Sequence, residues 1–208
     1  MRVAVVSDVH GNLPALEAVL AEIERERVDR IVCCGDVYEL LPAGDECRAL
    51  LERAGAFFIR GNGDPDLGWP LTLELGVEGL GRVLFCHATP RNNEDVFTEE
   101  IADEDVLRLF GPVAADVVVC GHTHMQVDRR LGDLRVVNPG SVGMPYEGLR
   151  GAFWALLGPD VEHRRTDYDV EAAVASLGEE RPDVAELLLR APSRREALDE
   201  LTPMFPRE

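Results

Sequence analysis

The first 60 residues alternate between compact apolar runs and amphipathic segments, a pattern typical of an α/β fold. A β-branched run at residues 2–7 precedes apolar residues at helical spacing over 13–26. The same order returns with apolar runs at 30–34 and 56–59 on either side of an amphipathic segment at 45–54. We therefore predict three strands and two helices in alternation over this part of the chain.

Shorter apolar runs separated by turn residues follow from residue 71, which predicts a region rich in antiparallel strands. Strands are predicted at 71–75, 82–86 and 116–120, and a helix at 103–110. Two hairpins are predicted downstream, the second of which turns through Gly-Pro-Asp. Their strands lie at 126–130 with 134–137 and at 152–157 with 161–165.

The chain beyond residue 167 is charged and has helical periodicity. Helices are predicted at 170–177, 182–190 and 193–201, and Ser193 with Glu196 forms a capping-box pattern at the start of the last one. The sequence contains no fixed-period repeat, long linker or low-complexity block. We expect a single domain over 1–208, with a core at about 1–167 and a helical C-terminal extension at about 168–208.

Composition indicates a globular protein and disfavours nucleic acids and membranes as its partners. The 208 residues are 46% hydrophobic and 29% charged, which excludes a wholly disordered chain. No apolar run is long enough for a signal peptide or a transmembrane helix, so we expect a cytoplasmic protein without a membrane partner. The net charge of −18 disfavours stable nucleic-acid binding, although bound cations could still attract an anionic substrate. The five cysteines lack C-x-x-C spacing and are expected to be reduced core thiols.

Polar residues follow the ends of five predicted strands. Ligands of open α/β sheets bind outside the carboxyl ends of the strands, so these side chains are expected to converge on one site. Residues two apart in an extended segment project to the same side, which suits chelation. Taken singly, each residue could be a cap, a turn residue or a buried core histidine. The candidate metal ligands are Asp8, His10, Asp36, Asn62, His87, His122 and His124.

The order of these residues resembles a known family. The chain carries Asp8-Val-His10, Gly35-Asp36, Gly61-Asn62-Gly-Asp64, His87 and Gly121-His122-Thr-His124 in sequence. This order resembles the calcineurin-like binuclear metallophosphoesterases over roughly residues 1–140, and in particular the small prokaryotic phosphodiesterase branch. The segment Asn-Pro-Gly-Ser at 138–141 resembles the late loop beneath the site in that family.

The resemblance implies a four-layer αββα sandwich of two mixed sheets, with metals at the carboxyl ends of the strands. Asp8, His10 and His124 would hold one divalent ion, Asn62, His87 and His122 would hold the other, and Asp36 would bridge them. Mn²⁺ is the expected ion, and Fe, Zn²⁺, Ni²⁺ and Co²⁺ also suit such ligands. The implied activity is hydrolysis of phosphodiesters or small activated phosphoesters, including nucleotides, by a metal-bridging hydroxide.

One position departs from the family pattern. Many members carry a histidine directly after the asparagine ligand, where it is thought to protonate the leaving group, and this chain has Gly63. Asp64 and Arg91 are candidate substitutes that would join Asp36 and His87 in the catalytic set, with Arg91 as a phosphate clamp. Asp64 could instead support a ligand or form a turn before Pro65, and Arg91 could lie in a solvated loop.

Two alternatives to a phosphodiesterase are left open, of which Gly63 favours only the first, since the missing histidine would favour the second if it were present. The first is a non-catalytic metal-binding scaffold of the same fold, and the second is a phosphomonoesterase or protein phosphatase. The expected partner is a small phosphoester or nucleotide substrate, and the sequence leaves a homo-oligomer open.

Overall fold

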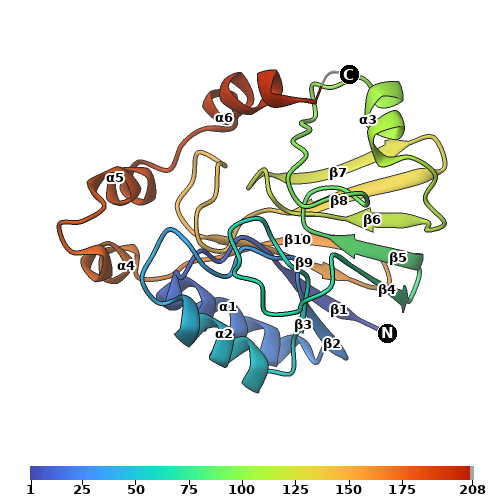
Figure 1. Ribbon diagram of the computed structural model, residues 1–208. Helices are drawn as coiled ribbons and strands as arrows, with labels where there is room; N and C mark the ends of the chain where they lie inside the picture. The colour runs from blue at the N-terminus through green and yellow to red at the C-terminus, as the bar shows by residue number, and fades with distance from the viewer. Residues whose placement is uncertain (207–208) are drawn as a thin grey trace.

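The computed structural model describes residues 1–206 and contains two five-stranded sheets packed face to face (Figure 1). The first sheet has the order β10-β9-β1-β2-β3 and the second has the order β4-β5-β6-β8-β7. Strands β1 (Val3–Val6), β2 (Arg30–Cys33) and β3 (Phe57–Phe58) run parallel, and β9 (Ala152–Leu157) and β10 (Val161–Thr166) run antiparallel to their neighbours. The predicted strand, helix and strand alternation of the first 60 residues is confirmed.

The second sheet differs from the antiparallel pattern that its short strands suggested. Its centre is parallel, because β5 (Gly81–Cys86) pairs with β6 (Val117–Val119), which pairs with β8 (Leu134–Pro139). Only the edge strands β4 (Thr72–Val77) and β7 (Gln126–Leu131) run antiparallel to their neighbours. Both sheets are therefore mixed, as the resemblance implied.

Alternation within the apolar runs fills two separate cores. Val3 and Val5 of β1 face the second sheet and meet Phe85 of β5 between the sheets. Ala4 and Val6 of the same strand point to the opposite face, where they pack on the helices. Because the strand is covered on both faces, its apolar run is continuous rather than alternating.

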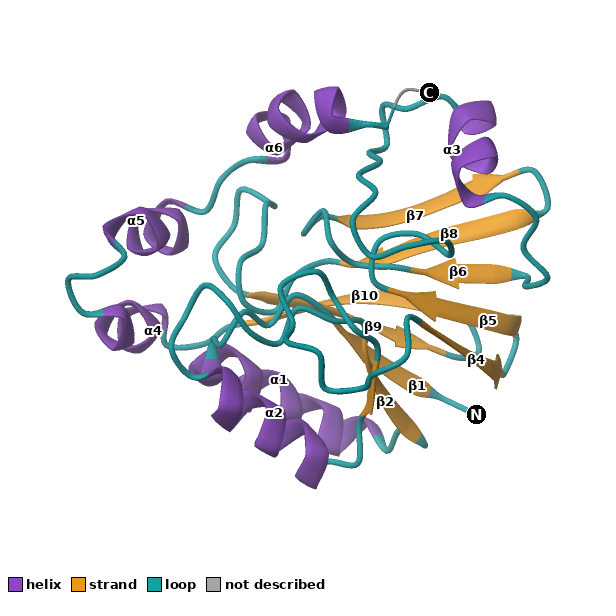
Figure 2. Cartoon of the chain, in the orientation of Figure 1, coloured by secondary structure: helices purple, strands orange, loops and turns teal. Residues whose placement is uncertain are grey.

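Helices cover the outer faces of both sheets and complete the four layers (Figure 2). Helix α1 (Leu13–Glu26) packs on the first sheet through Leu16, Val19 and Ile23, and α2 (Gly44–Arg53) lies beside it. The Asn12 side chain caps α1 by accepting the Ala15 N–H at 3.2 Å. Helix α3 (Asp103–Phe110) packs on the second sheet. The predicted αββα arrangement is confirmed.

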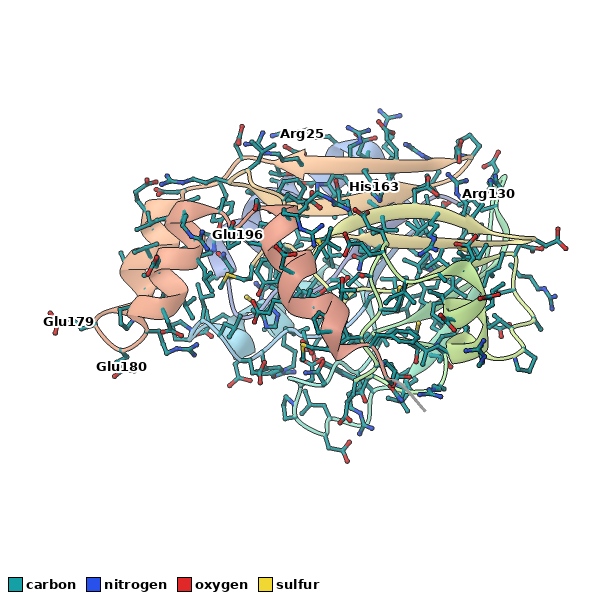
Figure 3. All side chains as sticks on the ribbon, turned by 90° about the horizontal axis from the view of Figure 1, so that it is seen from above. Arg25, Arg130, His163, Glu179, Glu180 and Glu196 are labelled. Atoms are coloured by element: carbon teal, nitrogen blue, oxygen red, sulfur yellow. The ribbon has the colours of Figure 1, made fainter. Side chains whose placement is uncertain are left out.

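The C-terminal extension forms three helices and a 3₁₀ turn. Helices α4 (Val170–Leu177), α5 (Pro182–Arg190) and α6 (Arg194–Leu201), with η1 (Thr202–Met204), form an arc beside the sandwich in Figure 1. The Ser193–Glu196 capping box is present. Figure 3 shows Glu179 and Glu180 at the outer tip of this arc, between α4 and α5.

The arc faces the edge where the loops after β1, β2, β3, β5 and β6 gather (Figure 2). The five cysteines are free and buried, as expected. Among the helices of residues 1–206, none has both the length and the apolar character needed to cross a bilayer.

Candidate metal centre

The candidate ligands adopt an unusual backbone conformation. Five of the eight non-glycine residues with positive φ between residues 1 and 206 are candidate ligands. Left-handed backbone is uncommon for residues with a Cβ, and it concentrates at functional sites because the surrounding structure must enforce it. These residues are Asp8, His10, Asp36, His122 and His124, with φ between 51 and 69°.

Asp8, His10 and His124 form the first group, and their ligand atoms lie within 4.8 Å of one another. The Nδ1–H of His10 donates to the Tyr38 carbonyl at 3.1 Å, and that of His124 donates to the Met144 carbonyl at 2.7 Å. The two Nε2 atoms face each other at 3.1 Å. If both rings are neutral, the lone pairs of these two Nε2 atoms repel each other, unless a proton or a cation lies between them.

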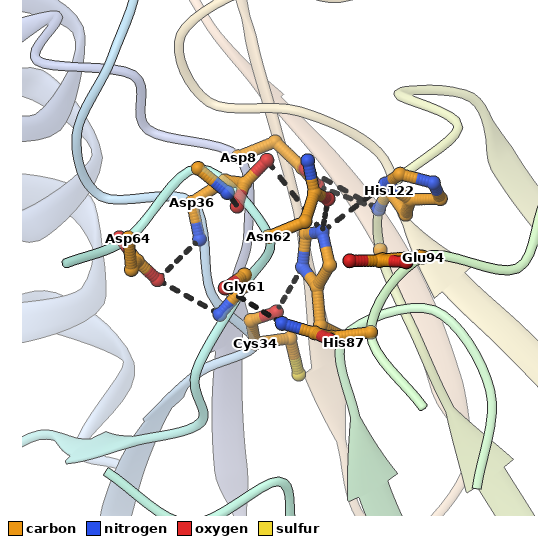
Figure 4. Close-up of polar contacts among 12 residues, drawn as sticks. Asp8, Cys34, Asp36, Gly61, Asn62, Asp64, His87, Glu94 and His122 are labelled. Atoms are coloured by element: carbon orange, nitrogen blue, oxygen red, sulfur yellow. Dashed lines mark hydrogen bonds and ion pairs between the residues drawn. The ribbon is translucent and has the colours of Figure 1, made fainter. Parts of the chain in front are cut away.

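The second group has the same character (Figure 4). The Nδ1–H of His87 donates to the Cys34 carbonyl at 2.7 Å, so its Nε2 is an acceptor in the neutral ring. That Nε2 faces Oδ1 of Asn62 at 3.0 Å and Nδ1 of His122 at 3.2 Å. Two further candidate ligand atoms therefore lie within 3.2 Å of Nε2 of His87.

Asp36 lies between the two groups. Its Oδ2 is 3.5 Å from Nε2 of His87 and 3.9 Å from Nε2 of His10. Its Oδ1 accepts the Gly63 N–H at 2.8 Å. Both carboxylate oxygens are almost fully shielded from solvent, since the side chain is only 4% exposed. A carboxylate in this position can contact ions in both groups.

Burial and neighbouring charge set the protonation of the site. Burial lowers the pKa of His10 to about 3, and burial together with nearby His87 lowers the pKa of His122 to about 4. Burial opposes protonation of His124 as well, but the adjacent Asp8 carboxylate overcomes it and raises the pKa of that ring. Burial raises the pKa of Asp36 to about 6, although the nearby His87 opposes this shift. His10 and His122 are therefore neutral at pH 7, as metal ligation requires.

The donor set fits borderline divalent ions. It combines carboxylate oxygen, imidazole nitrogen and one amide oxygen and contains no thiolate, a mixture suited to Mn, Fe, Co, Ni or Zn. The Nδ1–H bonds to backbone carbonyls fix the ring orientation of His10, His87 and His124, as is usual for metal-bound histidines. Two groups joined by Asp36 could hold one or two such ions.

Asp64 braces the backbone of the site. Its two oxygens accept backbone N–H groups from Asp36 at 2.9 Å, Val37 at 2.8 Å, Tyr38 at 3.3 Å and Gly61 at 2.9 Å. These bonds tie the loop after β2 to the loop after β3. The geometry favours the supporting role that the sequence left open for Asp64.

Arg91 lies in the loop after β5 and is engaged there. Its Nε donates to Oδ2 of Asp95 at 2.5 Å, and Asp95 also accepts the Thr89 hydroxyl at 3.1 Å. Arg91 also lines a cavity of about 600 Å³ with Arg108 and Phe205. Neither contact joins it to the candidate ligands.

The late loop holds two ligand segments together. The Asn138 side chain donates to the Gly121 carbonyl at 2.7 Å, and the Ser141 hydroxyl donates to the Asp8 carbonyl at 2.8 Å. Nearby, the Tyr146 ring stacks on His124 with centroids 4.9 Å apart. Sequence patterns gave no indication of Tyr146.

The sequence analysis also missed Glu39, which lies beside the site. A Glu39 carboxylate oxygen lies within 4.8 Å of ligand atoms of both His10 and Asp36. Glu39 belongs to no recognisable motif. Its closeness to the site depends on the path of the loop after β2, which no local pattern encodes.

Comparisons with known proteins agree with this geometry. Residues 1–157 match the family model of the calcineurin-like phosphoesterase superfamily domain. Phosphodiesterase YfcE of Escherichia coli K12 is 29% identical over 184 residues, covering 77% of this chain and 89% of that protein. The uncharacterized protein MJ0912 of Methanocaldococcus jannaschii is 26% identical over 230 residues, covering 86% of this chain and 93% of that protein.

A solved metallophosphoesterase from Sphaerobacter thermophilus has the same fold. The structures superpose with a TM-score of 0.74 at 24% identity, covering 92% of this chain and 99% of the other.

Proposed function

This chain belongs to the calcineurin-like phosphoesterase superfamily, and we propose that it hydrolyses phosphodiesters or small activated phosphoesters with two divalent metal ions. One observation carries the proposal. Two groups of candidate ligand atoms, one around Nε2 of His10 and His124 and the other around Nε2 of His87, share the Asp36 carboxylate. Phosphodiesterase YfcE, a relative of this chain, supports diesters as the favoured substrate class.

The chain's residues divide into two ligand sets. Asp8, His10 and His124 would hold one ion, Asn62, His87 and His122 would hold the other, and Asp36 would contact both. Two divalent ions there would acidify a water and neutralise charge on the phosphoryl oxygens. Mn²⁺ is the ion we expect, and Fe, Zn²⁺, Ni²⁺ and Co²⁺ are compatible with the same donors.

The protein supplies position and environment. Backbone carbonyls hold the histidine rings with Nε2 inward, and the Asp64 carboxylate fixes the loop that carries Asp36. Burial of Asp8 and Asp36 keeps water from competing for their oxygens. Gly63 brings no side chain to protonate a leaving group. We therefore expect faster turnover of esters with good leaving groups.

The test is hydrolysis of bis-p-nitrophenyl phosphate and p-nitrophenyl phosphate by metal-stripped protein reloaded with Mn²⁺. We expect metal-dependent turnover that favours the diester and falls at least about 100-fold in Asp36→Asn and His87→Ala. Asp66→Asn is the control, because Asp66 lies in the same loop as Asn62 but forms its ion pair with Arg60, away from the candidate ligands.

Any of three results would count against the proposal. Turnover that survives in Asp36→Asn would exclude the shared carboxylate. Tightly bound metal without turnover of any ester would favour the non-catalytic scaffold, and a preference for the monoester would favour a phosphatase.

A further inference from the structure

Glu39 presents a charge at the open side of the candidate metal centre. The ligands Asp8, His10 and Asp36 are buried, whereas Glu39 is exposed. One of its carboxylate oxygens nevertheless lies within 4.8 Å of ligand atoms of His10 and Asp36. Glu39 therefore borders solvent while its carboxylate lies close enough to the centre to act on a bound phosphoester.

The loop around Glu39 is held in place. The preceding residues Val37 and Tyr38 donate their N–H groups to Asp64, and Leu41 donates to the His10 carbonyl at 2.8 Å. The backbone of Glu39 itself has a φ of 96°, which side chains with a Cβ rarely adopt. Anchors on both sides of Glu39 fix where its side chain leaves the backbone.

The space that Glu39 occupies is open because residue 63 is glycine. A Cβ on Gly63 would lie 2.7 Å from Oε2 of Glu39 and 3.3 Å from Oδ1 of Asp36. A side chain at position 63 and the Glu39 carboxylate in its present place are thus mutually exclusive. The φ of Gly63 lies outside the left-handed region, so its backbone conformation alone does not require glycine.

No hydrogen bond or ion pair within the described residues 1–206 engages the Glu39 carboxylate. Arg181 of the C-terminal extension interacts with Glu39 electrostatically, but it forms its ion pair with Asp183 at 3.0 Å. A substrate at the centre would meet this charge directly.

We propose that Glu39 is a specificity-determining residue, whose charge over Gly63 disfavours dianionic phosphomonoesters and thereby favours monoanionic phosphodiesters. The inference rests on the proposed function for its biological meaning. A phosphomonoester carries close to two negative charges above its second pKa of about 6, whereas a diester carries one. At an effective dielectric of about 20, charges several ångströms apart interact strongly enough to change affinity by tenfold or more.

The test measures binding and does not depend on turnover. Methyl phosphate and dimethyl phosphate are titrated calorimetrically into Mn²⁺-loaded protein at pH about 8. We expect Glu39→Gln to bind methyl phosphate about tenfold more tightly and dimethyl phosphate within about threefold of the wild type. Glu46→Gln, which removes an equal charge from the exposed face of α2, is expected to leave the ratio of the two affinities unchanged.

Gly63→Ala gives an independent test without removing a charge. Its methyl group must displace the Glu39 carboxylate, which can move because it ends a flexible side chain. We expect the affinity ratio to shift in the same direction as in Glu39→Gln, and the double variant to show no further shift.

Equal changes for both ligands, or no change in either variant, would overturn the role of Glu39. Failure of the wild type to hydrolyse any ester would instead overturn the proposed function, while the binding ratio would still decide the role of Glu39.

Discussion

Replacement of Asp64 should destabilise the protein far more than its partly exposed position suggests. The carboxylate accepts four backbone N–H groups at 2.8 to 3.3 Å. A hydrogen bond to a charged group contributes about 1.5–3 kcal/mol, and four bonds that share two oxygens contribute less than their sum. We expect Asp64→Ala to lower the free energy of unfolding by about 3–5 kcal/mol.

Asp64→Asn should lower the free energy of unfolding by roughly half as much as Asp64→Ala, since the amide keeps one acceptor oxygen. The measurement is urea unfolding of the metal-free protein, followed by circular dichroism. Asp66→Ala is the matched control from the same loop. Its side chain is 81% exposed and, within residues 1–206, interacts only with the Gly68 N–H at 3.3 Å and Arg60 at 3.5 Å, so we expect a loss below about 0.5 kcal/mol.

The reasoning would be refuted if Asp64→Ala unfolded within about 1 kcal/mol of the wild type. Such a result would mean that water replaces the carboxylate at all four donors. A large loss in Asp66→Ala would be equally damaging, because it would show that the loop as a whole, rather than the carboxylate of Asp64, governs stability.

Three further predictions concern pH, packing and salt. Burial lowers the pKa of His10 to about 3 and of His122 to about 4, so the unfolded chain binds more protons than the folded chain below about pH 6.5. As the pH is lowered from about 6.5 to 4, the urea concentration at the unfolding midpoint of the metal-free protein should therefore decrease. Asp36, whose pKa burial raises to about 6, opposes part of this loss of stability. A midpoint that stays constant over this pH range would contradict these shifts. Gly121→Ala should prevent stable folding, since its Cβ would lie 1.9 Å from the buried hydroxyl of Ser7. Gly76→Ala is the control: its Cβ would meet no atom within 4 Å, so the melting temperature should change little. Because the net charge is −18, raising NaCl from about 0.05 to 0.5 M should raise the melting temperature by screening self-repulsion, and a fall would show that ion pairs dominate instead.

The local pattern of the sequence predicts most of the elements but not all of their pairing. The run at residues 3–6 is apolar at every position because β1 is covered on both faces, and this makes it recognisable as an inner strand. The parallel pairing of β6 with β5 and β8 was not predicted, because β7 lies between β6 and β8 in sequence but at the sheet edge in space. Strand direction here depends on long-range contacts rather than on periodicity.

The same distinction applies to the site. Asp8, His10, His122 and His124 occur in recognisable short motifs, and the structure brings them together, while their assignment as metal ligands remains a prediction. The relation between Glu39 and Gly63 could not be predicted, since it depends on the packing of two loops that are distant in sequence.

The central claim is that two ions share the Asp36 carboxylate and act together. The most direct test titrates Mn²⁺ into metal-stripped protein and measures bound metal and diester hydrolysis on the same samples. The account predicts two equivalents bound per chain, with turnover appearing as the second equivalent binds. Saturation at one equivalent, or full turnover before the second ion binds, would contradict it.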